Sequence, residues 1–284
     1  MLVKMKNIIR LFIGLFLIGL FSCEDPVPTD YIEEKFVEAY LIVNEPIRDI
    51  TVMKTQPLNS VFNYDSSFVG NLDVYIIEGE NRMKLEFNGK SYYYPDTTYL
   101  VKPQTKYFLE IDCTDGKKVS GETTTPSAFS WVNKPKDIIY FPKDTMNLPS
   151  VDSLVIEWEK STIFYLIAIT CIDTLEYGKY LTPVSDEMNR RIYKPFSNDR
   201  RYKEISSWSF MPNNKTPVVW NYFKWFGMHD VTIYSPDPNF LEWAIQYFVK
   251  NSYDPLLGSI KGGIGVFGSA AVVRDTSFIV KNQP

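Results

Sequence analysis

Short segments in which apolar and polar residues alternate constrain the fold of this chain more than any other feature of its sequence. Residues 72–76 and 107–111 each place an apolar side chain at every second position. That period is typical of a β-strand with one buried face. Asn88-Gly89 follows a similar segment and predicts a hairpin, because both residues accept a positive φ. About seven such segments predict an immunoglobulin-like or transthyretin-like β-sandwich over residues 36–125.

A second β-rich domain is predicted over residues 126–284, because the polar segment 123–127 favours a turn at the boundary. Residues 164–172 are almost continuously apolar, as expected of a strand that is buried on both faces. The domain closes with short, glycine-flanked strands that we predict at 265–267, 270–273 and 277–280.

One amphipathic helix is predicted at about 238–251. Asp237 is a favourable N-cap, and Pro238 suits the first helical position because a missing N–H costs nothing there. The apolar residues that share one face of this helix are Phe240, Leu241, Ala244, Ile245 and Phe248. The predicted fold class is therefore mainly β, with a single helix near the C-terminus.

Aromatic residues concentrate between residues 202 and 253, where four of the six tryptophans occur. The run 219–226 carries too many rings for one buried face of a strand. We therefore expect part of this run to form a partner surface, since exposed aromatic residues often anchor interfaces. The residues assigned to this surface are Trp220, Tyr222, Trp225 and Phe226. The alternative is that these rings belong to the core.

The charge of the chain does not favour nucleic-acid binding. Lys and Arg number 30 against 34 Asp and Glu, a net charge of −4, whereas nucleic-acid-binding proteins carry a basic surface. One basic stretch is either a solvated loop or a docking site for an acidic partner or lipid phosphates. It comprises Arg190, Arg191, Lys194, Arg200, Arg201 and Lys203.

The sequence contains no recognisable motif of an enzyme or a metal site. His229 is the one histidine, which excludes metal motifs with paired histidines. Residues 263–268 fit the GxGxxG pattern, but a strand is predicted after them, whereas a dinucleotide site needs a helix there. The glycines instead predict close backbone packing or a bulge. We expect no catalytic residues, no cofactor and no bound metal.

Cys113 and Cys171 lack the spacing of a metal-binding or redox motif. Each continues the apolar face of a predicted strand, which indicates two buried thiols. A disulfide between them is the alternative in an oxidising compartment.

Residues 1–22 predict a secretory signal peptide. Three basic residues precede the apolar run 11–21, which is shorter than the roughly 20 residues needed to span a bilayer. Ser22 before Cys23 resembles a bacterial lipobox, in which the cysteine is acylated and becomes the first residue of the mature chain. The alternative is an ordinary signal peptide with a coincidental cysteine.

Residues 23–35 are acidic and contain prolines, which predicts a tether between the lipid and the folded chain. Glu24 and Asp25 directly follow Cys23. In lipoproteins of Bacteroidota, an acidic pair at this position resembles a signal for export to the cell surface. The alternative is that the two acids are only part of a solvated linker.

The chain resembles the Bacteroidota lipoproteins grouped as domain of unknown function four-two-four-nine. The resemblance rests on the lipobox with Cys23, the segments 39–43, 72–77 and 99–111, the helix before Pro255 and the glycine-rich segment 262–268. Gln104 stands where the family usually places a glycine turn.

This resemblance implies a secreted lipoprotein, often encoded beside a TonB-dependent receptor and without established catalytic residues. We therefore expect a non-enzymatic protein that is lipid-anchored in the outer membrane, on the cell-surface side. Its expected role is that of an accessory or ligand-capture partner of a TonB-dependent outer-membrane transporter. The alternative is a structural or adhesive β-sandwich lipoprotein that binds another envelope or matrix component.

Replacing Cys23 with Ala is expected to abolish lipidation and to leave the protein soluble or uncleaved, because the thiol is the predicted acylation site. Metabolic labelling with a fatty-acid probe, followed by membrane fractionation, measures both effects. The Ser22→Ala variant keeps a small residue before the cysteine and serves as the control. Labelling and membrane retention that persist in the Cys23→Ala variant would contradict the assignment.

Overall fold

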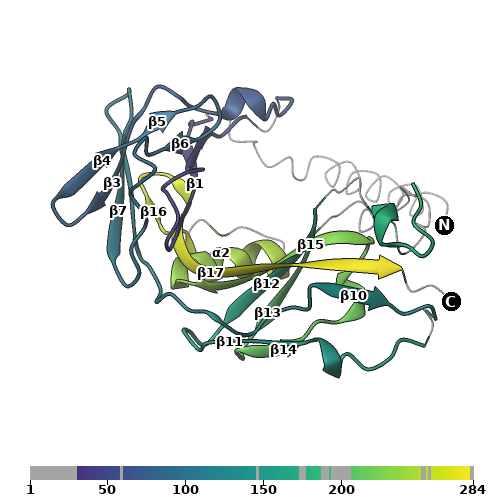
Figure 1. Ribbon diagram of the computed structural model, residues 1–284. Helices are drawn as coiled ribbons and strands as arrows, with labels where there is room; N and C mark the ends of the chain where they lie inside the picture. Colours follow the sequence, from purple (N-terminus) through teal and green to yellow (C-terminus); the bar gives the residue numbers. More distant parts are fainter. Residues whose placement is uncertain are drawn as a thin grey trace, which may run out of the picture. The chain divides into compact units, whose positions relative to one another are not determined.

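The computed structural model describes most of the chain after residue 30 (Figure 1). The described residues are 31–57, 60–144, 147–172, 177–186, 192, 206–250, 254 and 257–281. The predicted signal peptide 1–22, Cys23, Glu24 and Asp25 lie outside the described residues, as do all six residues of the basic stretch. What the sequence indicates for these positions stays a prediction.

The chain divides into two units. The described part of the smaller unit comprises residues 31–33, 56–57 and 60–62, where the Ser60 hydroxyl donates to the Pro57 carbonyl over 2.7 Å. The larger unit contains residues 34–55 and the chain from residue 63 onward. Every strand and helix named below belongs to this larger unit.

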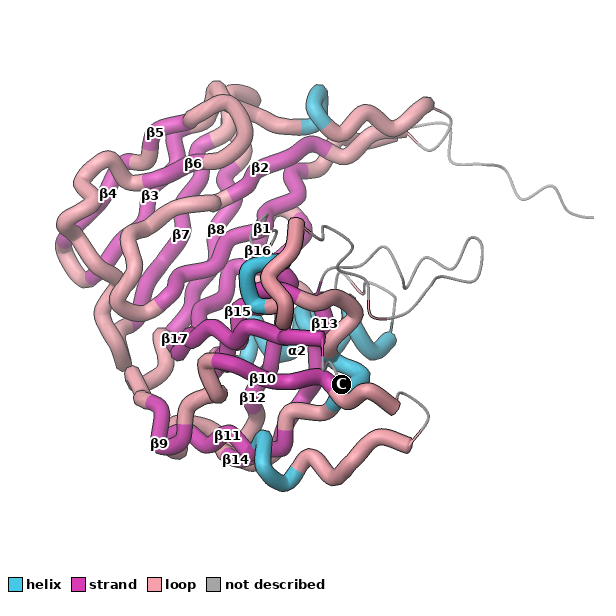
Figure 2. The backbone as a smooth tube through the Cα atoms, turned by 45° about the vertical axis from the view of Figure 1, so that its right-hand side comes forward, coloured by secondary structure: helices cyan, strands magenta, loops and turns pink. Residues whose placement is uncertain are grey.

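The first core of the larger unit forms between an antiparallel sheet and four further strands. The sheet has the order β16–β8–β7–β3–β4, and Figure 2 shows its last four strands side by side. Its members are β3 (Asp73–Glu78), β4 (Asn81–Lys84), β7 (Lys106–Asp112), β8 (Lys118–Thr124) and β16 (Ile260–Lys261). Side chains also come from β1 (Lys35–Ile42), β2 (Thr51–Lys54), β5 (Glu86–Phe87) and β6 (Tyr92–Tyr93). A 3-10 turn, η1, spans Asp65–Ser67.

The alternation in the sequence predicts this core correctly. Strand β3 buries Val74 and Ile76, and β7 buries Leu109 and Ile111, whereas the intervening residues reach solvent. Val74 pairs with Ile111, and Ile76 pairs with Leu109, so the two apolar sets meet on one face. The prediction of a β-sandwich in this part of the chain is confirmed.

The predicted Asn88-Gly89 hairpin is present between β5 and β6. Phe87 pairs with Tyr92 across it. The side-chain oxygen of Asn88 accepts a hydrogen bond from the Ser91 backbone N–H over 2.9 Å, and Gly89 has a φ of 104°. That φ lies in the left-handed region that glycine adopts without strain.

The second core forms between two further groups of strands. One is a small antiparallel sheet of β9 (Trp131–Asn133), β11 (Val155–Trp158) and β14 (Lys215–Pro217). The other comprises β10 (Ile138–Phe141), β12 (Tyr165–Cys171), β13 (Ser206–Met211), β15 (Gly227–Pro236) and β17 (Ile264–Lys281). The 3-10 turns around it are η2 (Asp152–Leu154), η3 (Tyr177–Tyr180) and η5 (Trp220–Tyr222). Strand β12 is buried on both faces, as the sequence predicts.

Each core contains a tyrosine that fixes the turn before its own strand. The Tyr107 hydroxyl accepts a hydrogen bond from the Lys102 backbone N–H over 2.9 Å. The Tyr165 hydroxyl accepts one from the Ser161 backbone N–H over 2.7 Å. Such contacts are typical of the tyrosine corner of immunoglobulin-like sandwiches. In the first of these turns, Gln104 has a φ of 51°, in the left-handed region that favours glycine.

Strand β17 contributes side chains to both cores of the larger unit, which the sequence does not predict. It is one continuous strand of 18 residues, so the expectation of separate short strands at 265–267, 270–273 and 277–280 is wrong. Its first part pairs in parallel with β1, its last part pairs in parallel with β10, and β15 pairs along its other edge. Backbone partners therefore continue across the glycines that appear to interrupt the strand in the sequence. Phe267 joins the first core, while Ile279 joins the second.

The described residues contain one α-helix, α2 (Pro238–Ile245), followed by a π-helical turn, η6 (Gln246–Lys250). Together they match the predicted helix closely, and the N-cap is the expected one, because the Asp237 carboxylate accepts from the Phe240 N–H over 2.9 Å. None of the described helices has the length and apolar character that crossing a membrane requires.

The Asp237 carboxylate also connects three elements of the fold. Besides capping α2, it accepts hydrogen bonds from the Ser269 backbone N–H of β17 over 3.0 Å and from the Thr123 hydroxyl of β8 over 2.7 Å. Burial raises its pKa, while these donors favour the charged form and oppose the rise. Asp237 thus ties the helix to strands that contribute to the first core.

Cys113 and Cys171 are both buried, and the structure places no disulfide between them. Cys113 packs within the first core, where it continues the inward face of β7. The prediction of two buried thiols is confirmed.

The glycine-rich segment before and within β17 allows backbones to approach closely, as the sequence predicts. A Cβ atom on Gly265 would lie 1.9 Å from the Val37 carbonyl oxygen of β1, and the φ of Gly265 is 115°. A Cβ atom on Gly268 would lie 2.9 Å from the Phe240 backbone nitrogen of α2. Side chains at these positions would therefore separate β17 from β1 and α2.

The Gly265→Ala variant is expected to lose at least about 3 kcal/mol of unfolding free energy, because strain at positive φ adds to a clash with backbone. Gly89→Ala is the matched control, since Gly89 has a φ of 104° but no atom within 4 Å of the added Cβ. It isolates the strain, which we expect to cost about 1 kcal/mol. Urea unfolding of both variants measures the difference, and equal losses would contradict the close approach.

Candidate ligand pocket

The predicted aromatic partner surface does not form as expected. Trp220 and Phe226 lie in the second core with exposed fractions of 7% and 8%, and both rings contact Phe141 edge to face. Trp220 also donates its indole N–H to the Pro149 carbonyl over 3.0 Å. Tyr222 and Trp225 are half-buried. The assignment of Trp220 and Phe226 to an exposed surface is therefore wrong.

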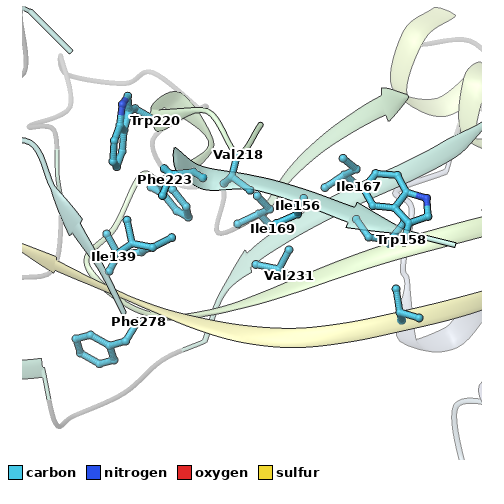
Figure 3. Packing of buried hydrophobic residues seen from close by; sticks show 14 of the residues in the cluster. Ile139, Ile156, Trp158, Ile167, Ile169, Val218, Trp220, Phe223, Val231 and Phe278 are labelled. Atoms are coloured by element: carbon cyan, nitrogen blue, oxygen red, sulfur yellow. The ribbon is translucent and has the colours of Figure 1, made fainter. Parts of the chain in front are cut away.

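The physical reason is the local backbone. The expectation treats the run as a strand, but residues 220–222 form the 3-10 turn η5. Such a turn directs successive side chains about 120° apart, so the run is not limited to one buried face. Trp220 and Phe223 reach the core in Figure 3, where Val218 and Ile139 are further members of the same cluster.

Exposed rings from the same aromatic-rich segment lie elsewhere, and one of them, Trp208, lines a pocket of about 250 Å³. The pocket opens on the face of β1, β15 and β17 opposite the residues that line the two cores. It is lined by Tyr40, Ile42, Glu45, Pro46, Arg48, Asp49, Trp208, Tyr234, Phe240 and Arg274. The pocket therefore combines an aromatic side with a charged side.

Alternation along the strands explains how the lining residues reach this face. On β1, Ala39 and Leu41 enter the first core, so Tyr40 between them points the other way. On β15 and β17, Ile233 and Val273 enter the second core, and the next residues, Tyr234 and Arg274, line the pocket. The rule that buries one face of each strand thus supplies the pocket with its side chains.

The aromatic side belongs to a row of rings in contact, which we call the aromatic row: Tyr40, Phe240, Tyr234, Trp208 and Phe248. The first four line the pocket, and Phe248 contacts Trp208 beyond it. Successive centroids lie 4.8, 6.0, 5.7 and 5.0 Å apart. The Trp208 ring is within 25° of parallel to both of its neighbours. Trp208 and Phe248 are 37% and 40% exposed, so the row presents apolar surface to solvent.

The charged side is a network centred on Glu45. Its carboxylate pairs with Arg48 over 2.8 Å and with Arg274, and Arg48 also approaches Asp49 to 3.8 Å. We call these four residues the charged network. Two guanidinium groups face two carboxylates, so the formal charges within the network balance.

The two phenols of the pocket stay neutral. Burial and the neighbouring Glu38 raise the pKa of Tyr40. Burial also raises the pKa of Tyr234, although Arg274 opposes that rise. Both side chains therefore carry a hydroxyl rather than a phenolate at neutral pH, and the pocket has hydrogen-bonding groups without an excess of either charge.

His229 lies away from this pocket and is 1% exposed. Its Nδ1 atom is 2.9 Å from the Gly227 carbonyl oxygen, and its ring meets Phe223 edge to face. These contacts are those of a histidine that packs in the core. Within the part of the chain that is described, no group of three or more His, Cys, Asp or Glu side chains is placed to hold a metal ion.

No protein-family model and no curated protein matches this chain. Among solved structures, the crystal structure of DIP-gamma IG1+IG2 aligns with 89% of this chain and 99% of that chain, at 8% sequence identity and a TM-score of 0.20. A TM-score this low supports no argument, so the β-sandwich assignment rests on the sheets and cores described above. The resemblance to the lipoprotein family stays a prediction.

The Trp220→Ala variant is expected to lose about 3–5 kcal/mol of unfolding free energy, because it leaves a cavity in the second core. Trp208→Ala makes the same chemical change at a ring that is partly in solvent, and we expect it to cost less than half as much. Thermal and urea unfolding followed by circular dichroism compare the two variants. Equal destabilisation would show that Trp208 is as much a core residue as Trp220.

Proposed function

We propose that this chain is a lipid-anchored lipoprotein of the outer membrane that is displayed on the cell surface and captures a ligand without converting it. We further propose that it is an accessory of a TonB-dependent transporter. The observation that carries the ligand-capture role is the open pocket lined by four rings of the aromatic row and by the charged network. Pockets that join apolar walls to a few convergent polar groups are the usual sites for small ligands.

The N-terminal sequence supports the anchored location. Cys23 follows a short apolar run and a small residue, and two or more acyl chains on a cysteine anchor a protein stably without a spanning segment. Glu24 and Asp25 support display on the cell surface. With a net charge of −4, the chain gains little from electrostatic attraction to an anionic membrane, so the lipid has to supply the attachment.

The chemistry of the pocket supports binding rather than catalysis. Each oxygen of the Glu45 carboxylate pairs with a guanidinium group, Oε2 with Arg48 and Oε1 with Arg274. A general acid or base needs a group that exchanges protons with the substrate near neutral pH. The charged network is better suited to hold hydrogen-bonding groups of a ligand in a fixed orientation.

Surface display and partner binding are tested together with the Glu24→Ala/Asp25→Ala double variant. We expect it to remain lipidated, to become resistant to protease shaving of intact cells, and to lose a TonB-dependent barrel that co-purifies with the tagged wild-type protein. The Glu33→Ala/Glu34→Ala variant removes the same charge farther along the tether and should behave as wild type.

Unchanged shaving of the first double variant would show that the acidic pair is only a linker. If the wild-type protein is on the surface but no barrel co-purifies, the transporter role is wrong. A structural or adhesive lipoprotein is then the better assignment.

A further inference from the structure

We infer that the pocket binds a carbohydrate, with a sugar ring against the aromatic row and its hydroxyl groups hydrogen-bonded to the charged network. This inference rests on the proposed ligand-capture role and names the class of ligand. It depends on three properties of the pocket: the arrangement of its rings, the balance of its charges and its size.

The aromatic row provides a surface for the apolar face of a sugar. The rings of Trp208, Phe248 and Tyr247 are 37%, 40% and 60% exposed, although burying such rings is strongly favourable. Trp208 is held close to parallel between Tyr234 and Phe248, which fixes its orientation before any ligand arrives. Pyranose rings present C–H groups on their faces, and those groups pack on aromatic rings.

The charged network fits hydroxyl groups better than it fits an ion. Glu45 is already paired with Arg48 and Arg274, so a charged ligand would have to compete with existing ion pairs and would gain no net attraction. Guanidinium groups have several donors in one plane, and each carboxylate oxygen has more than one lone pair, so both kinds of group can bond hydroxyls beside the existing ion pairs. A neutral polyol therefore binds here without disrupting the network.

A cationic ligand is disfavoured even though aromatic rings attract cations. A cation gains no net attraction from the charged network, because Arg48 and Arg274 balance Glu45 and Asp49 in the same pocket. An aromatic ligand would stack on the rings but would form no hydrogen bonds with the guanidinium and carboxylate groups of the charged network. A carbohydrate uses both sides of the pocket.

The size of the pocket is consistent with this ligand. Its volume of about 250 Å³ is slightly below the range for small-molecule sites, which is roughly 300–1,000 Å³. That space suits one sugar ring. Trp208 in the pocket stacks on the exposed Phe248, which contacts the exposed Tyr247, so these rings offer a surface along which a longer oligosaccharide extends.

The test uses the full lipidated protein in a detergent without a sugar headgroup. Maltohexaose, cellohexaose, xylohexaose and laminarihexaose are the probes, and isothermal titration calorimetry and tryptophan fluorescence are the readouts. We expect at least one probe to bind and to change the fluorescence of wild-type protein. The Trp208→Ala and Arg48→Gln variants should each weaken that binding at least tenfold.

Two control variants match these changes away from the pocket. Tyr140→Ala removes a ring that is 64% exposed on β10, and Arg82→Gln removes a guanidinium that pairs with Glu110 on the first sheet. Both should bind as wild type. Arg48 is chosen because its side chain is 59% exposed, so its replacement should leave folding intact, which the melting temperature verifies.

The absence of binding for all four probes would overturn the inference, as would binding that both pocket variants retain. These outcomes are separate from those of the proposed function. If no sugar binds but the protein is on the surface with its barrel, the ligand class is wrong and the transporter role stands. If a sugar binds through Trp208 and Arg48 but no barrel co-purifies, the carbohydrate assignment holds and the transporter role is wrong.

Discussion

The backbone pairing of β17 with β1 and β15 determines the positions of almost everything else in the larger unit. The parallel register brings Val37 opposite Gly265, and the antiparallel register brings Ile233 opposite Val273. Because β17 runs on through both cores, a change in either register would move the two cores relative to each other. Gly265 is essential to this arrangement, since any side chain there would meet the β1 backbone.

Asp237 fixes the helix to the same framework. A buried carboxylate is costly unless donors surround it, and here the cap of α2, the β17 backbone and a β8 hydroxyl all supply donors. Asn239 adds a further link, because its side-chain amide donates to the Phe267 carbonyl over 2.9 Å. These contacts also orient Phe240, the ring through which α2 contributes to the pocket. The polar cluster therefore supports both the fold and the candidate site.

Local pattern in the sequence was sufficient for many elements but not for the pocket. Alternation predicts β3 and β7, the Asn88-Gly89 pair predicts its hairpin, and Asp237 predicts the start of the helix, because each signal depends on neighbouring residues. The continuity of β17 depends on partners more than 200 residues away, such as Val37. Local pattern does not show these partners, so the glycines of β17 suggest breaks between short strands. Aromatic density located the right region, but only tertiary packing determines which rings are buried.

The pocket shows why such a site escapes sequence patterns and still follows from simple rules. Tyr40 and Arg274 face outward because their neighbours face a core, and the pairing of β1 with β17 brings the two strands together. The inner faces of these strands are committed to stability, whereas the outer face is free to vary in chemistry without disturbing the cores. The fold therefore separates most of the residues that form the two cores from those that line the candidate pocket.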